Sequence, residues 1–178
     1  MFLCSSGAEA NENALKLASF HTGKKRVVAF KNAFHGRTSA AVAATDNQNI
    51  NAPLNQQQEV TFIPFNDAHA LEKELQKGDV CAVIFEPIQG VGGLDMPQDD
   101  FVLKMEQLCQ QYETALIADE VQSGFSRSGT FFAFQNNNIK PHVITMAKGM
   151  GNGFPIGGIL VHPDVKPKYG MLGTTFGG

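Results

Sequence analysis

The chain has 178 residues, 43% of them hydrophobic, so it can bury the core of one domain and is not intrinsically disordered as a whole. Its 14 Lys and Arg residues against 17 Asp and Glu residues give a net charge of −3 without a basic stripe, which argues against a nucleic-acid partner. No apolar run approaches the roughly 18 residues of a membrane helix, and the three cysteines lack the spacing of a disulfide framework or a zinc knuckle. We therefore expect a cytoplasmic α/β domain without a membrane or nucleic-acid partner.

Apolar strands and amphipathic helices alternate along the chain. A first helix is predicted over Ala8–Phe20, because its alanines and leucine recur at spacings of three and four residues. Residues 45–58 are polar and indicate a loop, whereas Asp67 can cap a helix that runs to Lys77, and a further helix is predicted over Asp99–Glu113. The predicted strands are Arg26–Phe30, Val60–Phe65, Cys81–Phe85, Ala115–Ala118, His142–Ala147 and Ile156–Val161.

This alternation predicts one α/β domain with three layers (α/β/α), in which a mainly parallel sheet is covered by helices on both faces. In such a sheet, ligands bind outside the carboxyl ends of the strands. Three apolar strands are followed at that position by Glu86, Asp119 and Lys148, and we expect these side chains to converge at one edge. Solvated loop charges are the alternative explanation for these three residues.

Lys148 carries the most specific signal. Five glycines follow it within ten residues, so the backbone there can come close to a ligand. A lysine at the end of a buried strand can also form a Schiff base with a carbonyl group. The alternative is a surface lysine before a flexible turn, which leaves the glycines unexplained.

Three further segments add binding chemistry. The turn Ser6–Ala8 opens the first helix, whose N-terminus can bind an anion, although any serine N-cap has the same appearance. Phe34, next to His35, can stack on a planar ring, and Arg37 suits a carboxylate. An anion site, an aromatic face, a carboxylate and a lysine together meet the needs of pyridoxal phosphate (PLP).

Other chemistries lack their motifs. The sequence contains no phosphate loop, no HExxH, no opening GxGxxG and no GxSxG nucleophile elbow. No metal site is predicted, because four of the histidines lack metal-ligand spacing with one another: His21, His69, His142 and His162.

Six segments closely resemble the class III PLP-dependent aminotransferases of fold type I, nearest to the acetylornithine or succinylornithine branch. In chain order they are SSGAEANENALKLA, FHGRTSAA, FEPIQGVGG, LIADEVQSGFSRSG, TMAKGMGNGFPIGG and GTTFGG. The resemblance implies that residues 1–178 are part of the cofactor-binding large domain, without the N-terminal segment and the C-terminal small domain of the family. We expect this chain on its own to have little or no aminotransferase activity.

The resemblance also implies how the cofactor is bound at the first two segments. Ser6, Gly7 and Ala8 match the turn that binds the phosphate. Phe34 matches the aromatic residue that stacks on the ring, beside His35.

The later segments match the reactive part of the family site. Lys148 matches the Schiff-base lysine and Asp119 the partner of the pyridine nitrogen, and both are expected to be catalytic. Gln122 matches the residue near the phenolic oxygen, and Glu86 is expected to support the site from behind. Thr175 matches a threonine that reaches the phosphate of a neighbouring subunit, so a homodimer that shares its active sites is implied.

The implied reaction moves the amino group of an N-acylornithine to 2-oxoglutarate, giving the semialdehyde and glutamate in arginine biosynthesis. Lys148 would move the proton, and Arg37 matches the arginine that binds a substrate carboxylate. Val91 stands where many relatives have glutamate, which leaves the acyl group open between acetyl and succinyl.

Two alternatives stay open. One is another ω-aminotransferase or a relative of glutamate-semialdehyde aminomutase. The combination of FHGRT with GTTFGG favours the acylornithine branch over these. The other is a catalytically silent fragment that serves only in binding or oligomerisation. Retention of Asp119, Gln122 and Lys148 argues against loss of catalysis by drift, but not against truncation.

Overall fold

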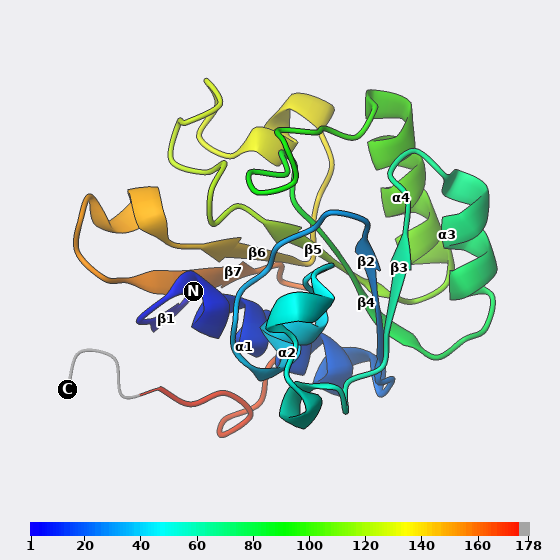
Figure 1. Cartoon of the computed structure of the whole chain (residues 1–178), viewed down its shortest axis with the longest axis horizontal. Helices are drawn as coiled ribbons and strands as arrows, with labels where there is room; N and C mark the ends of the chain where they lie inside the picture. The colour runs from blue at the N-terminus through cyan, green and yellow to red at the C-terminus, as the bar shows by residue number, and fades with distance from the viewer. Residues whose placement is uncertain (175–178) are drawn as a thin grey trace.

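Seven strands form one sheet in the order β1-β7-β6-β5-β4-β2-β3 in the computed structural model, which describes residues 1–174 (Figure 1). Strands β2 to β6 pair in parallel, whereas β7 runs antiparallel to both β6 and β1. The mainly parallel sheet predicted from the sequence is therefore confirmed. The strands are β1 (Phe2–Cys4), β2 (Arg26–Phe30), β3 (Val60–Ile63), β4 (Val80–Phe85), β5 (Ala115–Asp119), β6 (Val143–Met146) and β7 (Gly157–Val161).

Helices cover both faces of the sheet, which confirms the three-layer prediction. On one face, α1 (Gly7–Thr22) packs across β4 to β7 with the short α2 (Ser39–Ala43) beside it. On the other face, α3 (Ala68–Leu75) and α4 (Asp99–Gln111) lie side by side (Figure 1). Short 3-10 helices lie at Gln48–Ile50, Pro53–Asn55, Ala133–Asn137 and Lys148–Gly151, the first two within the segment expected to be a loop.

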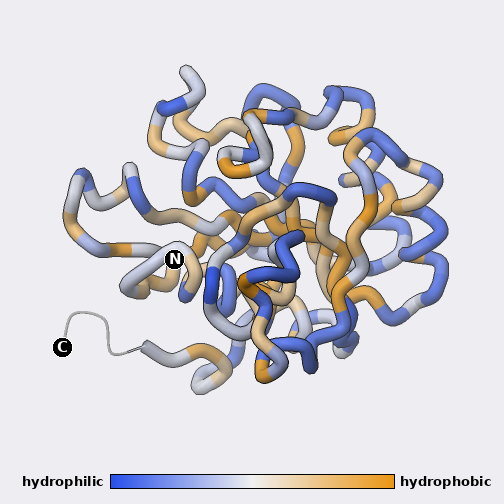
Figure 2. Tube along the Cα trace, in the orientation of Figure 1, coloured by the Kyte–Doolittle hydropathy of each residue, from blue (hydrophilic) through white to orange (hydrophobic). Residues whose placement is uncertain are grey.

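Each face of the sheet has its own core, because successive side chains of a strand point to opposite faces. In β4, Val83 and Phe85 pack with Leu108 of α4, whereas Ile84 packs with Leu17 of α1. Strands buried on both faces have continuous apolar sequences, and the central strands are accordingly orange in Figure 2. The two cores hold the sheet rigid beneath its carboxyl edge.

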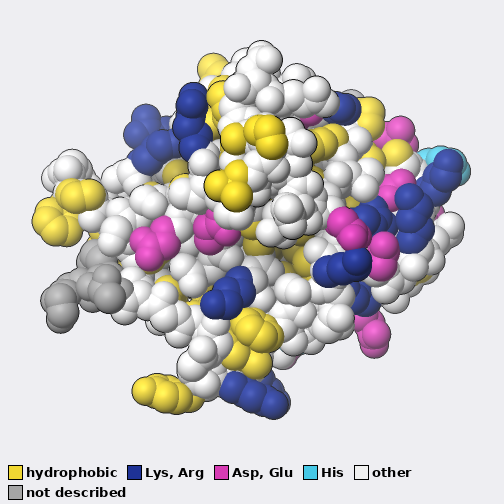
Figure 3. Space-filling model, turned by 60° about the horizontal axis from the view of Figure 1, so that its bottom comes forward, with side chains coloured by type: hydrophobic (Ala, Val, Ile, Leu, Met, Phe, Trp, Pro, Cys, Tyr) yellow, Lys and Arg dark blue, Asp and Glu magenta, His cyan; other side chains and the backbone are white. Residues whose placement is uncertain are grey.

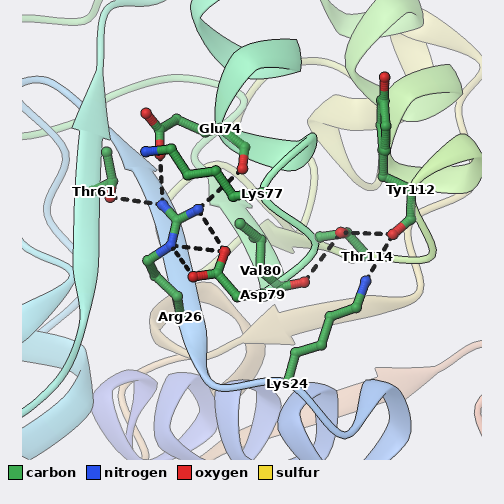
Figure 4. Close-up of polar contacts among 9 residues, drawn as sticks. All are labelled: Lys24, Arg26, Thr61, Glu74, Lys77, Asp79, Val80, Tyr112 and Thr114. Atoms are coloured by element: carbon green, nitrogen blue, oxygen red, sulfur yellow. Dashed lines mark hydrogen bonds and ion pairs between the residues drawn. The ribbon is translucent and has the colours of Figure 1, made fainter.

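A buried arginine joins three elements at the opposite edge of the sheet (Figure 4). Arg26, at the start of β2, is 8% exposed, and its Nη1 lies 2.6 Å from Oε2 of Glu74 in α3. Its Nη2 lies 2.7 Å from Oδ1 of Asp79, just before β4, and its Nη1 donates to Thr61 Oγ1 of β3 at 2.9 Å. These bonds lock β2, β3 and α3 together away from the carboxyl edge.

The surface shows mixed charge on the face drawn in Figure 3, where Lys and Arg side chains stand among Asp and Glu side chains on the right of the view. Within residues 1–174, none of the helices has both the length and the apolar character needed to span a bilayer.

Candidate active site

The carboxyl ends of the parallel strands meet at one edge of the sheet, next to a cavity of about 300 Å³. Glu86 follows β4, Asp119 ends β5 and Lys148 follows β6, and all three line this cavity. Its volume falls at the lower end of the range for small-molecule sites. Six more of the site residues predicted from the sequence line the same cavity: Gly7, Ala8, Phe34, His35, Arg37 and Gln122.

The Asp119 carboxylate is 4% exposed and accepts four hydrogen bonds. Its Oδ2 accepts from Asn11 Nδ2 at 2.8 Å and from His35 Nδ1 at 2.7 Å. Its Oδ1 accepts from the backbone N–H of Val121 at 3.1 Å and from Thr145 Oγ1 at 3.3 Å. Donors from four elements or turns therefore fix the orientation of this carboxylate.

The His35 ring is buried beside Asp119. An ionised carboxylate only accepts hydrogen bonds, so the hydrogen between them belongs to His35 Nδ1. Burial disfavours the charged ring, but the hydrogen bond and negative charge of Asp119, helped by the charge of Glu86, outweigh burial and raise the pKa of His35. The other ring nitrogen, Nε2, is buried without a partner among residues 1–174.

Glu86 supports the turn that carries the aromatic ring. It is 6% exposed, and its Oε2 accepts from the backbone N–H of Phe34 at 3.0 Å. Burial raises the pKa of Glu86 to about 7, with a further increase from Asp119, while His35 and the backbone N–H groups of Phe34 and Gly90 act in the opposite direction. Glu86 thus ties the end of β4 to the turn after β2.

Lys148 and Gln122 contact each other at the wall of the cavity. The Lys148 backbone has φ 47°, in the left-handed region, and its Nζ donates to Gln122 Oε1 at 2.9 Å. The Lys148 side chain is exposed, so its amine is accessible. The Gln122 amide lies over Gly90, where a Cβ would be 1.8 Å from Gln122 Nε2, so only glycine fits beneath it.

The N-terminus of α1 forms another wall of the cavity. Ser6 is the N-cap, and its Oγ accepts from the backbone N–H of Glu9 at 3.1 Å. Ser6 does not itself line the cavity, but Gly7 and Ala8 do. A Cβ at Gly7 would lie 2.6 Å from Cγ1 of Val121, so glycine lets the helix end approach the turn after β5.

Two further predicted residues do not belong to the polar centre described above: Arg37 lies at its rim, and the structure does not describe Thr175. Arg37 is exposed at the rim, and its guanidinium has no ion-pair partner within the described part of the chain, so it is free to bind an anion. Thr175 lies outside the described residues.

The sequence interpretation missed Asn11 and Thr145. Asn11 is 1% exposed and lies three and seven residues before Ala14 and Ala18, on the buried face of α1. A polar amide on an apolar helix face is a signal that could have identified it. Thr145 lies within a buried strand and offers no comparable signal.

The residues at this cavity fit PLP. The helix N-terminus suits a phosphate, Phe34 suits a ring face, Asp119 suits a ring N–H and Lys148 supplies an amine. A larger groove of about 580 Å³ runs along α1, but it contains none of the strand-end groups. We therefore place the site at the smaller cavity.

Comparisons with known proteins identify the family of the chain. A family model described as aminotransferase class-III matches residues 1–178. The chain is 43% identical to the acetylornithine aminotransferase of Halalkalibacterium halodurans and 43% identical to a mitochondrial acetylornithine aminotransferase of Debaryomyces hansenii, in each case over its whole length. These matches cover 47% and 40% of the two relatives, so the chain spans less than half of their length.

Solved structures share the fold. An ornithine aminotransferase from Toxoplasma gondii superposes with a TM-score of 0.90 at 29% identity, covering 98% of this chain and 44% of that one. A taurine:2-oxoglutarate aminotransferase from Bifidobacterium kashiwanohense, in complex with PLP and glutamate, superposes with a TM-score of 0.82 at 29% identity. That match covers 92% of this chain and 42% of the other.

Proposed function

The chain belongs to the class-III aminotransferase family, and from this premise we propose that residues 1–178 are part of the cofactor-binding large domain of an aminotransferase. Enzymes of this class depend on PLP. The observation that carries the proposal is the meeting of Lys148 Nζ, the Asp119 carboxylate and the N-terminus of α1 at one cavity.

Each wall of the cavity would bind a different part of the cofactor. When bound, PLP supplies an aldehyde that reacts with amines and a ring that accepts the electron pair left by a departing proton. The backbone N–H groups at Ser6–Ala8 would bind the phosphate, and Phe34 would pack against the ring. Asp119 would accept the ring N–H, and four fixed donors already hold its carboxylate in place.

Lys148 is the group that would attach to the cofactor and carry the proton at the substrate carbon. Its amine is accessible and held by Gln122 at 2.9 Å, so it can be released without breaking a buried ion pair. Arg37, exposed at the rim, would bind a carboxylate of the substrate.

We propose an N-acylornithine as amino donor and 2-oxoglutarate as acceptor, which would place the reaction in arginine biosynthesis. The naming of the two relatives at 43% identity supports this donor. The match to an ornithine aminotransferase, with its TM-score of 0.90, makes free ornithine the second candidate. The cytoplasmic location stays a prediction, since one of these relatives is named mitochondrial.

We also propose a homodimer. Three large apolar side chains on the loop after β4 are exposed, Val91, Leu94 and Met96, as is Phe131 on the loop after β5. Exposed apolar side chains gathered beside a site are typical of protein interfaces. A monomer in sedimentation-velocity experiments with bound PLP would contradict this part of the proposal.

The test titrates the purified chain with PLP and follows the visible absorption of the bound cofactor. We expect saturable binding, weakened roughly tenfold or more by Asp119→Asn, because the amide cannot serve as a charged acceptor for the ring N–H. N-acetylornithine should then change the spectrum at lower concentration than free ornithine or N-succinylornithine. No binding to the folded chain would contradict the site, and a preference for free ornithine would contradict the donor.

A further inference from the structure

Asn11 lies where three parts of the site meet. Its side chain is buried in the second turn of α1, and its Nδ2 donates to the carbonyl oxygen of His35 at 2.7 Å and to Asp119 Oδ2 at 2.8 Å. The two hydrogens of one amide nitrogen therefore bridge the turn after β2 and the end of β5. Asn11 is thus bonded to both residues of the His35–Asp119 pair.

We propose that Asn11 is a positioning residue that sets the orientation of the Asp119 carboxylate and of the Phe34-His35 turn together. The proposal rests on the proposed function, in which Asp119 faces the ring nitrogen and Phe34 the ring face. Because Asn11 sits one turn after Gly7, it also fixes both groups relative to the helix end that would bind the phosphate.

Only an uncharged group with two donors meets this requirement. A leucine, which has the same branched shape, would leave the His35 carbonyl without a donor and remove one of the two bonds to Asp119 Oδ2. An aspartate would place two carboxylates within hydrogen-bond distance, which is unfavourable unless one is protonated. Asparagine has no helix-forming advantage, so its presence inside α1 points to a tertiary role.

The expected consequence of losing the amide is rotation of the carboxylate. Asp119 would keep His35 on Oδ2 and the two longer bonds on Oδ1, from Val121 and Thr145. Hydrogen bonds to charged groups are strong enough that the loss of one corresponds to roughly a tenfold to hundredfold change in an equilibrium constant. We expect a change of that order in PLP affinity.

The experiment compares Asn11→Ala and Asn11→Leu with Asn13→Ala. Asn13 is a matched control, because it lies on the same helix, is 8% exposed and, among residues 1–174, donates from its side chain only to the Glu9 carbonyl, at 2.9 Å, away from the cavity. The first readout needs no cofactor: the His35 Nδ1–H proton resonance in nitrogen-15-labelled protein, which reports on the bond to Asp119. The second readout is the dissociation constant for PLP.

We expect both Asn11 variants to move the His35 resonance and to weaken PLP binding, and Asn13→Ala to do neither. Folded Asn11 variants with an unchanged resonance would overturn the proposal. Failure of both to fold, with Asn13→Ala folded, would also overturn it, because the amide would then serve the fold rather than the site. Absence of PLP binding in the unmodified chain would refute the proposed function, while the resonance would still decide the role of Asn11.

Discussion

Gly90 determines where the Gln122 side chain lies, because the Gln122 amide occupies the space that a side chain at position 90 would fill. A Cβ there would lie 1.8 Å from Nε2 and 2.4 Å from Cδ of Gln122, too close for either residue to stay in place. Gly90→Ala should therefore push Gln122 away from Lys148 and break the 2.9 Å hydrogen bond. We expect PLP affinity, measured by absorption titration, to fall roughly tenfold, because the displaced Gln122 could no longer bind the phenolic oxygen of the cofactor and a lost hydrogen bond to a charged group has an effect of that order.

A double-mutant cycle isolates this effect. If the added Cβ at position 90 acts only through Gln122, then Gly90→Ala should not lower PLP affinity any further in a chain that already carries Gln122→Ala. Gly173→Ala is the control, because a Cβ at Gly173 meets no atom of residues 1–174 within 4 Å. Additive losses from the two substitutions would show that Gly90 matters for another reason.

Glu86 should make stability depend on pH. Its pKa of about 7 in the folded chain lies above the ordinary value of 4.5, so the folded state binds this proton more tightly than the unfolded state. The stabilising contribution is complete below pH 4.5 and is lost as the pH rises to about 7. Glu86→Gln should abolish this pH-dependent decrease in the free energy of unfolding, which amounts to at most about 3 kcal/mol. The glutamine side-chain oxygen can still accept from the Phe34 N–H.

Urea unfolding between about pH 4.5 and pH 8 measures the difference. Glu59→Gln is the control, since the Glu59 side chain is 50% exposed and its one ion pair within the described part of the chain is with the exposed Lys25. Parallel pH profiles for the unmodified chain and Glu86→Gln would contradict the assignment.

At the scale of elements, Arg26 is the main polar link between β2, β3 and α3 (Figure 4). Arg26→Ala would remove the ion pairs to Glu74 and Asp79 and the bond to Thr61, and would leave the largely buried Glu74 carboxylate paired with the more exposed Lys77, at 2.7 Å. We expect a loss of about 3 kcal/mol in the free energy of unfolding, typical of a broken buried pair. The neighbouring Lys25→Ala breaks one exposed pair, with Glu59, and should lower the free energy of unfolding far less than Arg26→Ala does.

Thermal or urea unfolding of both variants tests this account of the sheet. Because Arg26 lies at the edge opposite the cavity, PLP affinity of the folded Arg26→Ala variant should stay unchanged. Equal stabilities for the two variants would show that the buried network contributes no more than the surface pair.

Element order was predictable because periodicity separates strands from helices, and parallel strands bring their ends together. Glu86, Asp119 and Lys148 could therefore be expected at one edge from the sequence alone. The five-residue helix Ser39–Ala43 was missed because it is too short to show a helical period. Asn11 was missed because its two acceptors lie 24 and 108 residues away along the chain, and their approach depends on the tertiary fold.

At the scale of the whole molecule, one open-edged sheet brings a helix end, an aromatic turn and three strand ends to a single cavity. The chain covers less than half of its matched relatives, yet Lys148, Asp119 and the N-terminus of α1 lie together at one cavity within it. PLP attachment therefore tests the central claim independently of turnover.

The most direct measurement is to incubate the purified chain with PLP, reduce it with borohydride and map the modified peptide by mass spectrometry. The site geometry predicts one covalently labelled residue, Lys148, with the label lost in Lys148→Ala and retained in Lys140→Ala. Labelling spread over several surface lysines, or a folded chain that takes up no label, would contradict the assignment of this cavity as the cofactor site.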